Sequence, residues 1–302
     1  MLNLNQLQTE KNNDLTKEID RLSTIDCLTL INDEDQKVAL KVQEKKEQIA
    51  SLIDSLYQEM MQGGRLIYAG AGTSGRIALL DAVECPPTYG VDASLVTCLM
   101  AGGDSAFAYA KEGAEDDEAQ AVLDLESLKP TKHDFLIALA ASGRTPYALA
   151  MVKKAHELGM KTGCIVNTLN SKLASSVDYP IEIETGAEVI SGSTRMKAGT
   201  AQKLVCNMIS TMVMIKLGHV FENYMIDLRA TNVKLIARQL SIIENICQID
   251  ESEAQALLTK HQTVKKAILA HFTKIEDNDE LDTLLAKNNN NLRKAIEEKN
   301  ND

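Results

Sequence analysis

Compact runs of apolar residues alternate with stretches of helical periodicity along the central part of the chain. The apolar runs occupy residues 66–69, 95–100, 135–139, 163–166 and 180–183. Between them, apolar residues recur at helical spacing around residues 76–83, 104–127, 146–158 and 171–176. Non-alternating apolar strands are typical of a parallel sheet that helices cover on both faces. The pattern predicts an α/β fold built on a doubly wound parallel sheet.

Helical periodicity also precedes the first apolar run. Residues 1–22 are polar and carry little pattern, so we expect an irregular arm there. Asn32 is a good N-cap and is followed by three acidic residues, which predicts that a long helix begins at this point. Gly63 and Gly64 should end that helix, because glycine readily adopts the left-handed conformation that follows a helix. The predicted N-terminal region, an arm and a helix, spans residues 1–56.

The last third of the chain shows helical spacing only. A strong helical pattern runs from Lys197 to Leu217. The methionines on it and beside it are expected in the core, namely Met196, Met208, Met212 and Met214. Shorter helical patterns follow, and the polar, asparagine-rich tail at 288–302 is expected to fray. We therefore predict a helical C-terminal domain at residues 221–302.

Composition excludes several classes of protein. The chain has 302 residues, of which 44% are apolar and 25% charged, so a substantial core can form. Its net charge of −11 argues against a nucleic-acid partner, because phosphate backbones require a basic surface. An anionic ligand would need local positive charge against this background. No segment approaches the roughly 18 apolar residues of a membrane span, and the polar start lacks a signal peptide, so no membrane partner is expected.

The cysteines and histidines show no metal-binding pattern. Six cysteines are scattered without a C-x-x-C pair, and most lie in apolar stretches where cysteine packs as a small hydrophobic residue. The five histidines form neither H-x-x-H nor H-E-x-x-H. We therefore expect a protein of the reducing cytoplasm without a metal site.

A glycine-rich loop follows the first predicted strand. Residues 70–76 (GAGTSGR) open a helix, and the glycines would let backbone N–H groups approach an anion at the helix N-terminus. The loop also fits G-x-G-x-x-G, the pattern of a dinucleotide site. Such a site needs an acid about 20 residues further on, at the end of the next strand. The first acid beyond the predicted strand 95–100 is Asp104, which is too distant. A P-loop is excluded, because no Gly-Lys-Ser/Thr follows.

Two further loops of similar composition favour a small phosphorylated sugar over a dinucleotide. Residues 141–146 (ASGRTP) and 191–197 (SGSTRMK) are rich in hydroxyls, carry basic residues and precede helices. Ligands of open parallel sheets bind beyond the carboxyl ends of the strands, where such loops lie. The candidate substrate contacts are Gly72, Thr73, Ser74, Arg76, Ser142, Gly143, Arg144, Thr145, Ser191, Ser193, Thr194 and Lys197. Alternatively, the three loops are ordinary N-caps and turns.

Two acidic segments are candidates for acid/base chemistry. Glu84 comes just before a double proline, which is expected to end its helix, and Glu115 lies in the acidic segment 112–117. Without a metal, such chemistry needs one protonated and one ionised carboxylate, which different burial can provide. The alternatives are a helix-end residue for Glu84 and a helix N-terminal charge cluster for residues 116–118. No G-x-S-x-G motif supports a nucleophilic serine.

Taken together, these segments resemble the N-acetylmuramic acid 6-phosphate etherase family. The strings that carry the resemblance are 70–76, 81–88 (DAVECPPT), 112–116 (EGAED), 140–146 and 191–203 (SGSTRMKAGTAQK), with lead-in strings at 9–10, 20–24 and 32–35. The string 191–203 is shared with the related glucokinase regulatory proteins, whereas 81–88 and 112–116 point to the etherases. Residues 11–14 (KNND) depart from the Asn-Pro-containing turn of relatives, and the C-terminal tail matches poorly.

The resemblance implies a sugar-isomerase (SIS) domain at 57–220, with a flavodoxin-like three-layer sandwich, and a homodimer whose active sites lie near the subunit interface. It also implies cleavage of the D-lactyl ether of N-acetylmuramic acid 6-phosphate to N-acetylglucosamine 6-phosphate and D-lactate, a step of peptidoglycan recycling. Glu84 and Glu115 fall on the family's functional acids. We expect Glu84 to protonate the leaving lactate and Glu115 to remove the C2 proton, although the two roles could be exchanged.

The chemistry implied by the resemblance needs no metal, nicotinamide or covalent nucleophile, so no cofactor is expected. In the open-chain sugar, the C1 aldehyde acidifies the C2 proton, and proton transfers can then drive β-elimination and water addition. Three other functions use similar loops and stay open at this point. They are a non-catalytic sugar-phosphate-binding regulatory protein, an aldose–ketose isomerase and a nucleotide-dependent oxidoreductase.

Overall fold

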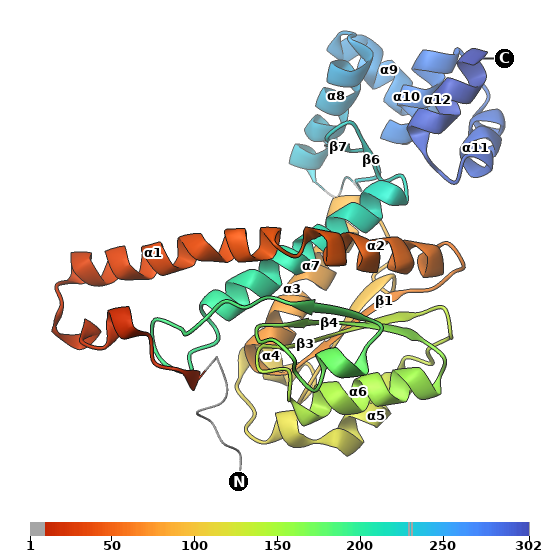
Figure 1. The fold of residues 1–302 in the computed structure, drawn as a ribbon. Helices are drawn as coiled ribbons and strands as arrows, with labels where there is room; N and C mark the ends of the chain where they lie inside the picture. The colour runs from red at the N-terminus through yellow and green to blue at the C-terminus, as the bar shows by residue number, and fades with distance from the viewer. Residues whose placement is uncertain (1–9, 229, 231, 302) are drawn as a thin grey trace. The chain divides into compact units, whose positions relative to one another are not determined.

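A computed structural model describes residues 10–228, 230 and 232–301 and contains a five-stranded parallel sheet (Figure 1). The sheet order is β2-β1-β3-β4-β5, and every pair of neighbouring strands is parallel. The strands are β1 (Leu66–Gly70), β2 (Val96–Met100), β3 (Phe135–Ala140), β4 (Lys161–Val166) and β5 (Tyr179–Glu182). The predicted fold class and all five predicted strands are confirmed. The lead-in string 9–10 begins outside the described residues.

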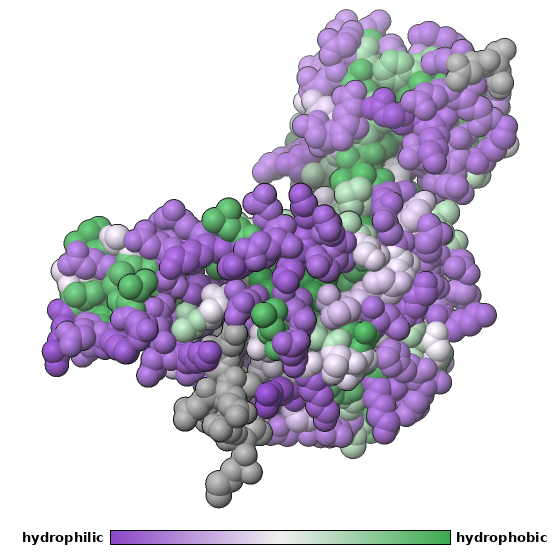
Figure 2. All heavy atoms as spheres, in the orientation of Figure 1, coloured by the Kyte–Doolittle hydropathy of each residue, from purple (hydrophilic) through white to green (hydrophobic). Residues whose placement is uncertain are grey.

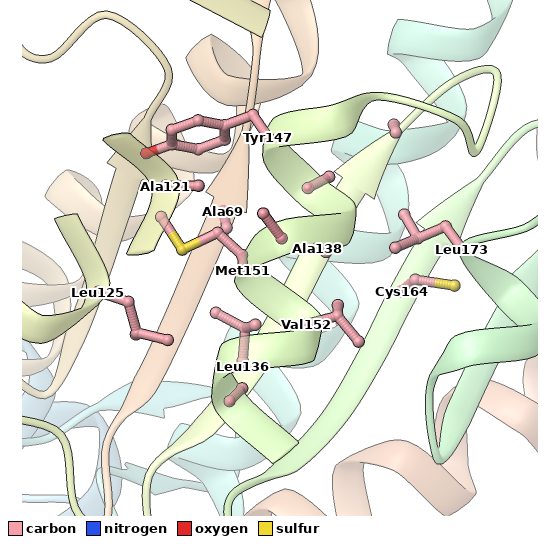
Figure 3. Close-up of a cluster of buried hydrophobic side chains, with 14 of the residues drawn as sticks. Ala69, Ala121, Leu125, Leu136, Ala138, Tyr147, Met151, Val152, Cys164 and Leu173 are labelled. Atoms are coloured by element: carbon pink, nitrogen blue, oxygen red, sulfur yellow. The ribbon is translucent and has the colours of Figure 1, made fainter. Parts of the chain in front are cut away.

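Helices cover both faces of the sheet (Figure 1). Figure 3 shows α6 over one face, where Met151 packs with Leu125 of α5 and Leu136 of β3 in one buried cluster. On the opposite face, Leu52 of α2 packs so closely on Gly163 of β4 that an added Cβ would lie 2.6 Å from it. The helices of this part are α1 (Thr24–Gln43), α2 (Lys46–Met60), α3 (Gly72–Tyr89), α4 (Ser105–Ala108), α5 (Glu118–Ser127), α6 (Pro146–Glu157) and α7 (Lys197–Lys216).

The chain forms two compact units. The first runs up to Val83 and resumes from Ser94 to Ser210, whereas the second comprises Glu84–Ala93 and the chain from Thr211 onward. Helices α3 and α7 therefore contribute residues to both units. The second unit also contains β6 (Val220–Phe221), β7 (Tyr224–Met225), α8 (Val233–Cys247), α9 (Glu251–His261), α10 (Val264–Thr273), α11 (Asn278–Lys287) and α12 (Leu292–Asn301).

The second unit has an apolar core of its own. Ile243 of α8, Ile268 of α10 and Leu281 of α11 are fully buried in it. Hydrophilic residues cover most of the face of this unit that Figure 2 shows. Leu292 and Ala295 of α12 join the same core. The expectation that residues 288–302 fray is therefore wrong for the described part of the tail, because two apolar side chains spaced by three residues anchor a helix there.

The N-terminal helix begins earlier than the sequence predicts. Ser23, and not Asn32, caps α1, and its hydroxyl accepts a hydrogen bond from the backbone N–H of Asp26 at 3.3 Å. A break separates α1 from α2, and the predicted stop is confirmed by Gly63, which has φ +86°. The preceding arm contains two short 3-10 turns, η3 (Asp14–Thr16) and η4 (Ile19–Arg21).

Two other predicted helices are interrupted. The stretch 104–127 is not one helix, because α4 ends at Ala108 before the extended Tyr109, and Gly113 then adopts a left-handed conformation with φ +74°. A short turn, η5 (Ala114–Asp116), follows, and Asp117 then caps α5 by accepting a hydrogen bond from the backbone N–H of Gln120 at 2.8 Å. The stretch 171–176 contains only the turn η6 (Ala174–Ser176).

The double proline does not end α3. The helix continues through both prolines to Tyr89, and the N–H of Gly90 donates to the carbonyl oxygen of Pro86 at 2.9 Å. Proline disfavours helix in the residue before it but does not forbid it. The expected helix end near Glu84 is therefore wrong.

Helix α7 confirms the predicted helix. The prediction that its methionines lie in the core is confirmed only in part. Met214 is fully buried. Met208 and Met212, however, are 45% and 39% exposed in the single chain. These two side chains lie on the side of α7 that the described chain leaves uncovered.

Arg65 and Asp134 join β1 and β3 at the amino ends of the strands. The guanidinium of Arg65 donates to both carboxylate oxygens of Asp134, at 3.0 and 2.8 Å. Asp134 is 1% exposed and also accepts the backbone N–H groups of Arg65 and Thr131. Burial works against ionisation of Asp134, but these hydrogen bonds outweigh it and hold the pKa of its carboxyl below the ordinary value.

We predict that Asp134→Ala lowers the free energy of unfolding by about 2–4 kcal/mol, because it leaves a half-buried guanidinium and two backbone N–H groups without their acceptor. Denaturant unfolding followed by circular dichroism measures the change. The matched control is Glu44→Ala, which removes an exposed ion pair with Lys41 and should cost under about 1 kcal/mol.

The effect of Asp134→Ala should also depend on pH. Because the folded-state pKa of Asp134 is lowered, its contribution is fully present above the ordinary value of 3.8 and is lost as the pH falls through the folded pKa. The difference between parent and variant should therefore stay constant from neutral pH down to about pH 5 and shrink below about pH 4. A constant difference down to the lowest pH would contradict the ion-pair explanation.

Candidate active site

The first glycine-rich loop packs α3 directly onto the end of β1. A Cβ added to Gly70 would lie 2.9 Å from the backbone nitrogen of Gly75, and one added to Gly75 would lie 2.8 Å from the carbonyl oxygen of Gly70. Only glycine fits at both positions. Gly72 is exposed with φ +54°, Thr73 is half-buried and Ser74 is buried. The first turn of α3 is thus held at the edge of the sheet where β1 ends.

The second hydroxyl-rich loop follows β3, which neighbours β1 in the sheet. Because parallel strands point the same way, the loops after β1 and β3 leave the sheet at one edge. Gly143 in the second loop has φ +61°, and a Cβ added there would lie 2.4 Å from the side chain of Ser171. The other candidates of this loop are half-buried or exposed, namely Ser142, Thr145 and Arg144.

The third loop precedes α7, and the first turn of α7 contacts the first loop. A Cβ added to Gly199 would lie 3.4 Å from the side chain of Thr73, and the N–H of Gly199 donates to the carbonyl oxygen of Thr194 at 3.0 Å. Ser193 and Thr194 are half-buried. Ser191 is exposed, and its hydroxyl donates to a backbone carbonyl of the N-terminal arm. The first and third loops therefore lie side by side.

A carboxylate of the chain itself occupies the N-terminus of α7. Glu188 is 1% exposed and accepts hydrogen bonds from the backbone N–H groups of Lys197 and Ala198, both at 2.9 Å. Burial raises the pKa of Glu188, and these hydrogen bonds oppose the rise. An anion is stabilised at a helix N-terminus, and here that place is taken. No sequence motif marks Glu188, which lies just outside the string 191–203.

Two of the three predicted basic contacts, Lys197 and Arg76, have partners inside the fold. Lys197 is 2% exposed, and its ammonium pairs with the buried carboxylate of Glu34 in α1. A direct contact of Lys197 with phosphate therefore stays a prediction. The guanidinium of Arg76 donates to the carbonyl oxygens of Ala106 and Phe107, at 2.8 Å each. These two bonds hold the segment after β2 against α3.

A cavity of about 210 Å³ lies at the carboxyl ends of β1 and β2. Three of the predicted site residues line it, Gly72, Arg76 and Glu115. The other lining residues are Ala71, Met100, Ala101, Ala106, Ala110, Lys111, Glu112, Gly113 and Ala114. The structure thus brings the first loop together with the EGAED segment. None of the described residues that line the cavity carries a hydroxyl, so the serines and threonines of the three loops lie outside its walls.

The two predicted catalytic glutamates differ in position. Glu115 belongs to η5 and is exposed at the cavity. Glu84 is exposed on α3, where the segment that belongs to the second unit begins, and it is not among the described residues that line the cavity. Asp117 caps α5, which confirms a helix N-terminal role within 116–118. A joint role of Glu84 and Glu115 stays a prediction.

Asp81, one helical turn before Glu84, is a buried carboxylate without a predicted role. It accepts hydrogen bonds from the hydroxyl of Tyr68 at 3.1 Å, the amide of Asn207 at 2.6 Å and the hydroxyl of Ser210 at 3.0 Å. Burial raises the pKa of Asp81, although these hydrogen bonds oppose the rise. Because its donors belong to β1 and α7, Asp81 fixes the helix that carries Glu84.

Three other properties of the described residues bear on function. They contain no group of three or more His, Cys, Asp or Glu side chains arranged to hold a metal ion. All six cysteines are free thiols. Among the helices that the structure describes, none is both long and apolar enough to cross a bilayer.

Three stretches of the chain match known domain families. Residues 48–156 match the glucokinase regulatory protein N-terminal SIS domain, residues 124–212 the SIS domain, and residues 222–290 the C-terminal lid domain of glucokinase regulatory protein. A solved phosphoheptose isomerase from Francisella tularensis superimposes with a TM-score of 0.51 and covers 64% of this chain and 100% of its own. Its sequence identity is 16%, so this likeness concerns the fold alone.

Relatives of known name cover almost the whole chain. A Clostridium botulinum (strain Eklund 17B / Type B) protein named N-acetylmuramic acid 6-phosphate etherase is 48% identical over 97% of this chain and 97% of its own. The Bacillus subtilis (strain 168) protein of the same name is 44% identical over 98% of this chain and 97% of its own. The chain therefore belongs to the N-acetylmuramic acid 6-phosphate etherase family.

Proposed function

We propose that this protein cleaves the D-lactyl ether of N-acetylmuramic acid 6-phosphate and produces N-acetylglucosamine 6-phosphate and D-lactate. The observation that carries the proposal is the full-length identity of 44–48% to proteins named as etherases. The cavity that joins the first loop to Glu115 supports it. The protein is thus a carbon–oxygen lyase of amino sugar catabolism, with a place in peptidoglycan recycling.

The proposed reaction proceeds by elimination and hydration on the open-chain sugar. The C1 aldehyde acidifies the C2 proton, which a carboxylate base removes. The electron pair of the C2–H bond forms the C2–C3 double bond while the C3–O bond breaks, and a carboxyl group protonates the ether oxygen as D-lactate leaves. Water then adds its hydroxyl to C3 and a proton returns to C2. The net change is the hydrolysis of one ether bond.

Glu84 is the proposed acid and Glu115 the proposed base, and the exchanged assignment fits the same chemistry. Both carboxylates are exposed in the chain without substrate. Asp81 supports Glu84 from one helical turn away, because its hydrogen bonds to β1 and α7 hold α3 in place.

The substrate phosphate is held by the three hydroxyl-rich loops. Their arrangement supports this, since the first two leave neighbouring strands at one edge of the sheet and the third contacts the first. Arg76 and Arg144 supply positive charge, while Lys197 would have to leave Glu34 to reach the phosphate directly. The proposed contacts with hydroxyl or backbone donors are Gly72, Thr73, Ser74, Ser142, Gly143, Thr145, Ser191, Ser193 and Thr194.

A non-catalytic, regulatory sugar-phosphate-binding protein is the second candidate. The matches to the SIS and lid domains of glucokinase regulatory protein favour it. Such a protein needs the phosphate loops but neither Glu84 nor Glu115. Incubation with N-acetylmuramic acid 6-phosphate and an assay for D-lactate distinguishes the two functions. Binding of the substrate without release of D-lactate would contradict the lyase and favour the regulatory protein.

A cytoplasmic homodimer is proposed for the assembly. Leu80 and Val83 of α3 and Met208 of α7 are 49%, 53% and 45% exposed. The two helices are adjacent here, because Asn207 of α7 binds Asp81 of α3. Exposed apolar side chains that gather in this way are typical of an interaction surface. The free thiols support the cytoplasm as the compartment.

We predict that Glu84→Gln and Glu115→Gln each reduce the rate of D-lactate release by about 10²–10⁴-fold, because each removes one proton transfer. Binding of N-acetylglucosamine 6-phosphate, measured by calorimetry, should persist in both variants. Glu118→Gln is the matched control, since Glu118 is exposed on the nearby α5 and does not line the cavity. Release of D-lactate at the parent rate by either variant would remove that residue from the mechanism.

Deuterium exchange distinguishes the two assignments of the glutamates. In deuterated water, the variant that lacks the base should stop incorporating deuterium at C2, whereas the variant that lacks the acid should still exchange the C2 proton without releasing lactate. Mass spectrometry of recovered substrate measures both. If Glu115→Gln still incorporates deuterium at C2 and Glu84→Gln does not, Glu84 is the base and Glu115 is the acid.

We predict that the double variant Leu80→Glu/Met208→Glu is a monomer at concentrations where the parent is a dimer, because four carboxylates would have to be buried at the interface. Light scattering after gel filtration measures the mass. Leu123→Glu on α5 is the control, as Leu123 is 59% exposed on the helix layer of the other sheet face. A monomeric parent, or a dimeric double variant, would contradict this interface.

A further inference from the structure

Lys111 is a cation at the cavity that neither the sequence motifs nor the proposed mechanism uses. It lies between α4 and η5, one residue before the EGAED segment. Its ammonium donates to the carbonyl oxygen of Gly102 at 2.6 Å. Gly102 has φ +87°, and a Cβ added there would lie 3.0 Å from Cδ of Lys111. The absence of a side chain at Gly102 thus leaves room for the lysine stem, and its carbonyl fixes the ammonium.

The hydrogen bond to Gly102 positions the ammonium without cancelling its charge. In the described part of the chain, Lys111 forms no ion pair with a carboxylate. An ammonium has three N–H donors, so donors remain for a ligand. Glu112 and Glu115 line the same cavity. A negatively charged ligand would be repelled by these two carboxylates unless a nearby cation offset them.

The walls of the cavity suit a small group that is part apolar and part anionic. Apart from its charged residues, the cavity is lined by two glycines and by alanine and methionine side chains. Four of the alanines lie beyond the end of β2, namely Ala101, Ala106, Ala110 and Ala114. Its volume of about 210 Å³ lies below the roughly 300 Å³ at which pockets for whole drug-sized ligands begin. The cavity therefore fits one part of the substrate.

Of the two anionic groups of the substrate, the lactyl carboxylate matches this cavity better than the phosphate. Of the proposed phosphate contacts, Gly72 and Arg76 line this cavity, but none of the proposed hydroxyl contacts does. The lactyl group carries a methyl, which the alanines can pack, and a carboxylate, which the ammonium of Lys111 can bind. Its ether oxygen is attached to C3, next to the C2 proton that the proposed chemistry requires Glu115 or Glu84 to remove.

We infer that Lys111 binds the carboxylate of the D-lactyl group and so selects ethers that carry an acid on the leaving group. This inference rests on the proposed lyase activity. Lys111 is a specificity-determining residue in this role, because it contacts the leaving group and takes no part in proton transfer. The neighbouring Arg76 is a proposed phosphate contact, and two of its donors also hold α4.

The test is Lys111→Met, assayed in the full chain by release of D-lactate. Loss of a hydrogen bond between charged groups should raise KM for N-acetylmuramic acid 6-phosphate about 10- to 100-fold, with kcat within a few-fold of the parent. Inhibition by the product N-acetylglucosamine 6-phosphate should be unchanged, because the product lacks the lactyl group. Lys111→Arg should restore most of the affinity. Lys153→Met, an exposed lysine of α6, is the matched control.

A second substrate completes the test as a double-mutant cycle. In the parent, a substrate whose lactyl carboxylate is converted to the N-methylamide should have a KM raised by a similar factor, and Lys111→Met should no longer distinguish the amide from the acid. Thermal unfolding checks that the variant is folded. An unchanged KM overturns the inference, as does an equal loss of product inhibition, which would place Lys111 on the phosphate. A parent that releases no D-lactate refutes the lyase itself, which is a separate outcome.

Discussion

Parallel pairing of the strands is the constraint on which the candidate site depends. Since β1 pairs in parallel with β2 and with β3, the chain must return across a face of the sheet after each strand. The segments that follow these three strands therefore leave the sheet at one edge, although they lie far apart in sequence. The glycines of the first loop add a second constraint, because the contact between Gly70 and Gly75 sets α3 directly on that edge. Sheet order and close packing thus bring the walls of the cavity together, and polar contacts such as those of Arg76 hold them there.

The three hydroxyl-rich loops are similar in composition, but their charged and N–H groups have different partners in the fold. At the third loop, Glu188 takes the N–H groups that begin α7, and Glu34 neutralises Lys197. Some of the N–H donors and positive charge that the composition offers to an anion are therefore already bound by carboxylates of the chain itself. Both interactions tie α7 to the rest of the first unit, so the same residues that resemble a phosphate site also hold the scaffold in place. Composition cannot separate these two uses, because it does not say which partners the fold provides.

Long apolar runs could be interpreted from the sequence, whereas several helix ends and the paths of the loops could not. All five strands were predictable, because a strand buried on both faces is apolar throughout. The helix predicted over 104–127 is broken at the extended Tyr109 and at the left-handed Gly113. Helix α3, in contrast, continues through its double proline. Local backbone conformations decide both results. No sequence motif marks Lys111, for a related reason. Its acceptor is the carbonyl of Gly102, and only the folded path of the intervening loop brings the two together. The sequence marks Glu115 by its acidic segment and by a string that resembles a family, whereas its position at a cavity is seen only in the structure.

The two cations at the cavity, Arg76 and Lys111, are held by carbonyl oxygens, and this matters for the binding of an anionic substrate. A protein of net charge −11 repels a substrate that carries both a phosphate and a carboxylate, but at physiological ionic strength this repulsion is screened over about 8 Å. Charges inside the site therefore decide binding. An ion pair such as that of Lys197 with Glu34 fixes a lysine and also cancels its charge. Arg76 and Lys111 are fixed instead by neutral carbonyl oxygens, which orient a cation and leave its charge available. A cation held in this way has already lost its side-chain freedom before the ligand arrives, so that cost no longer weakens binding.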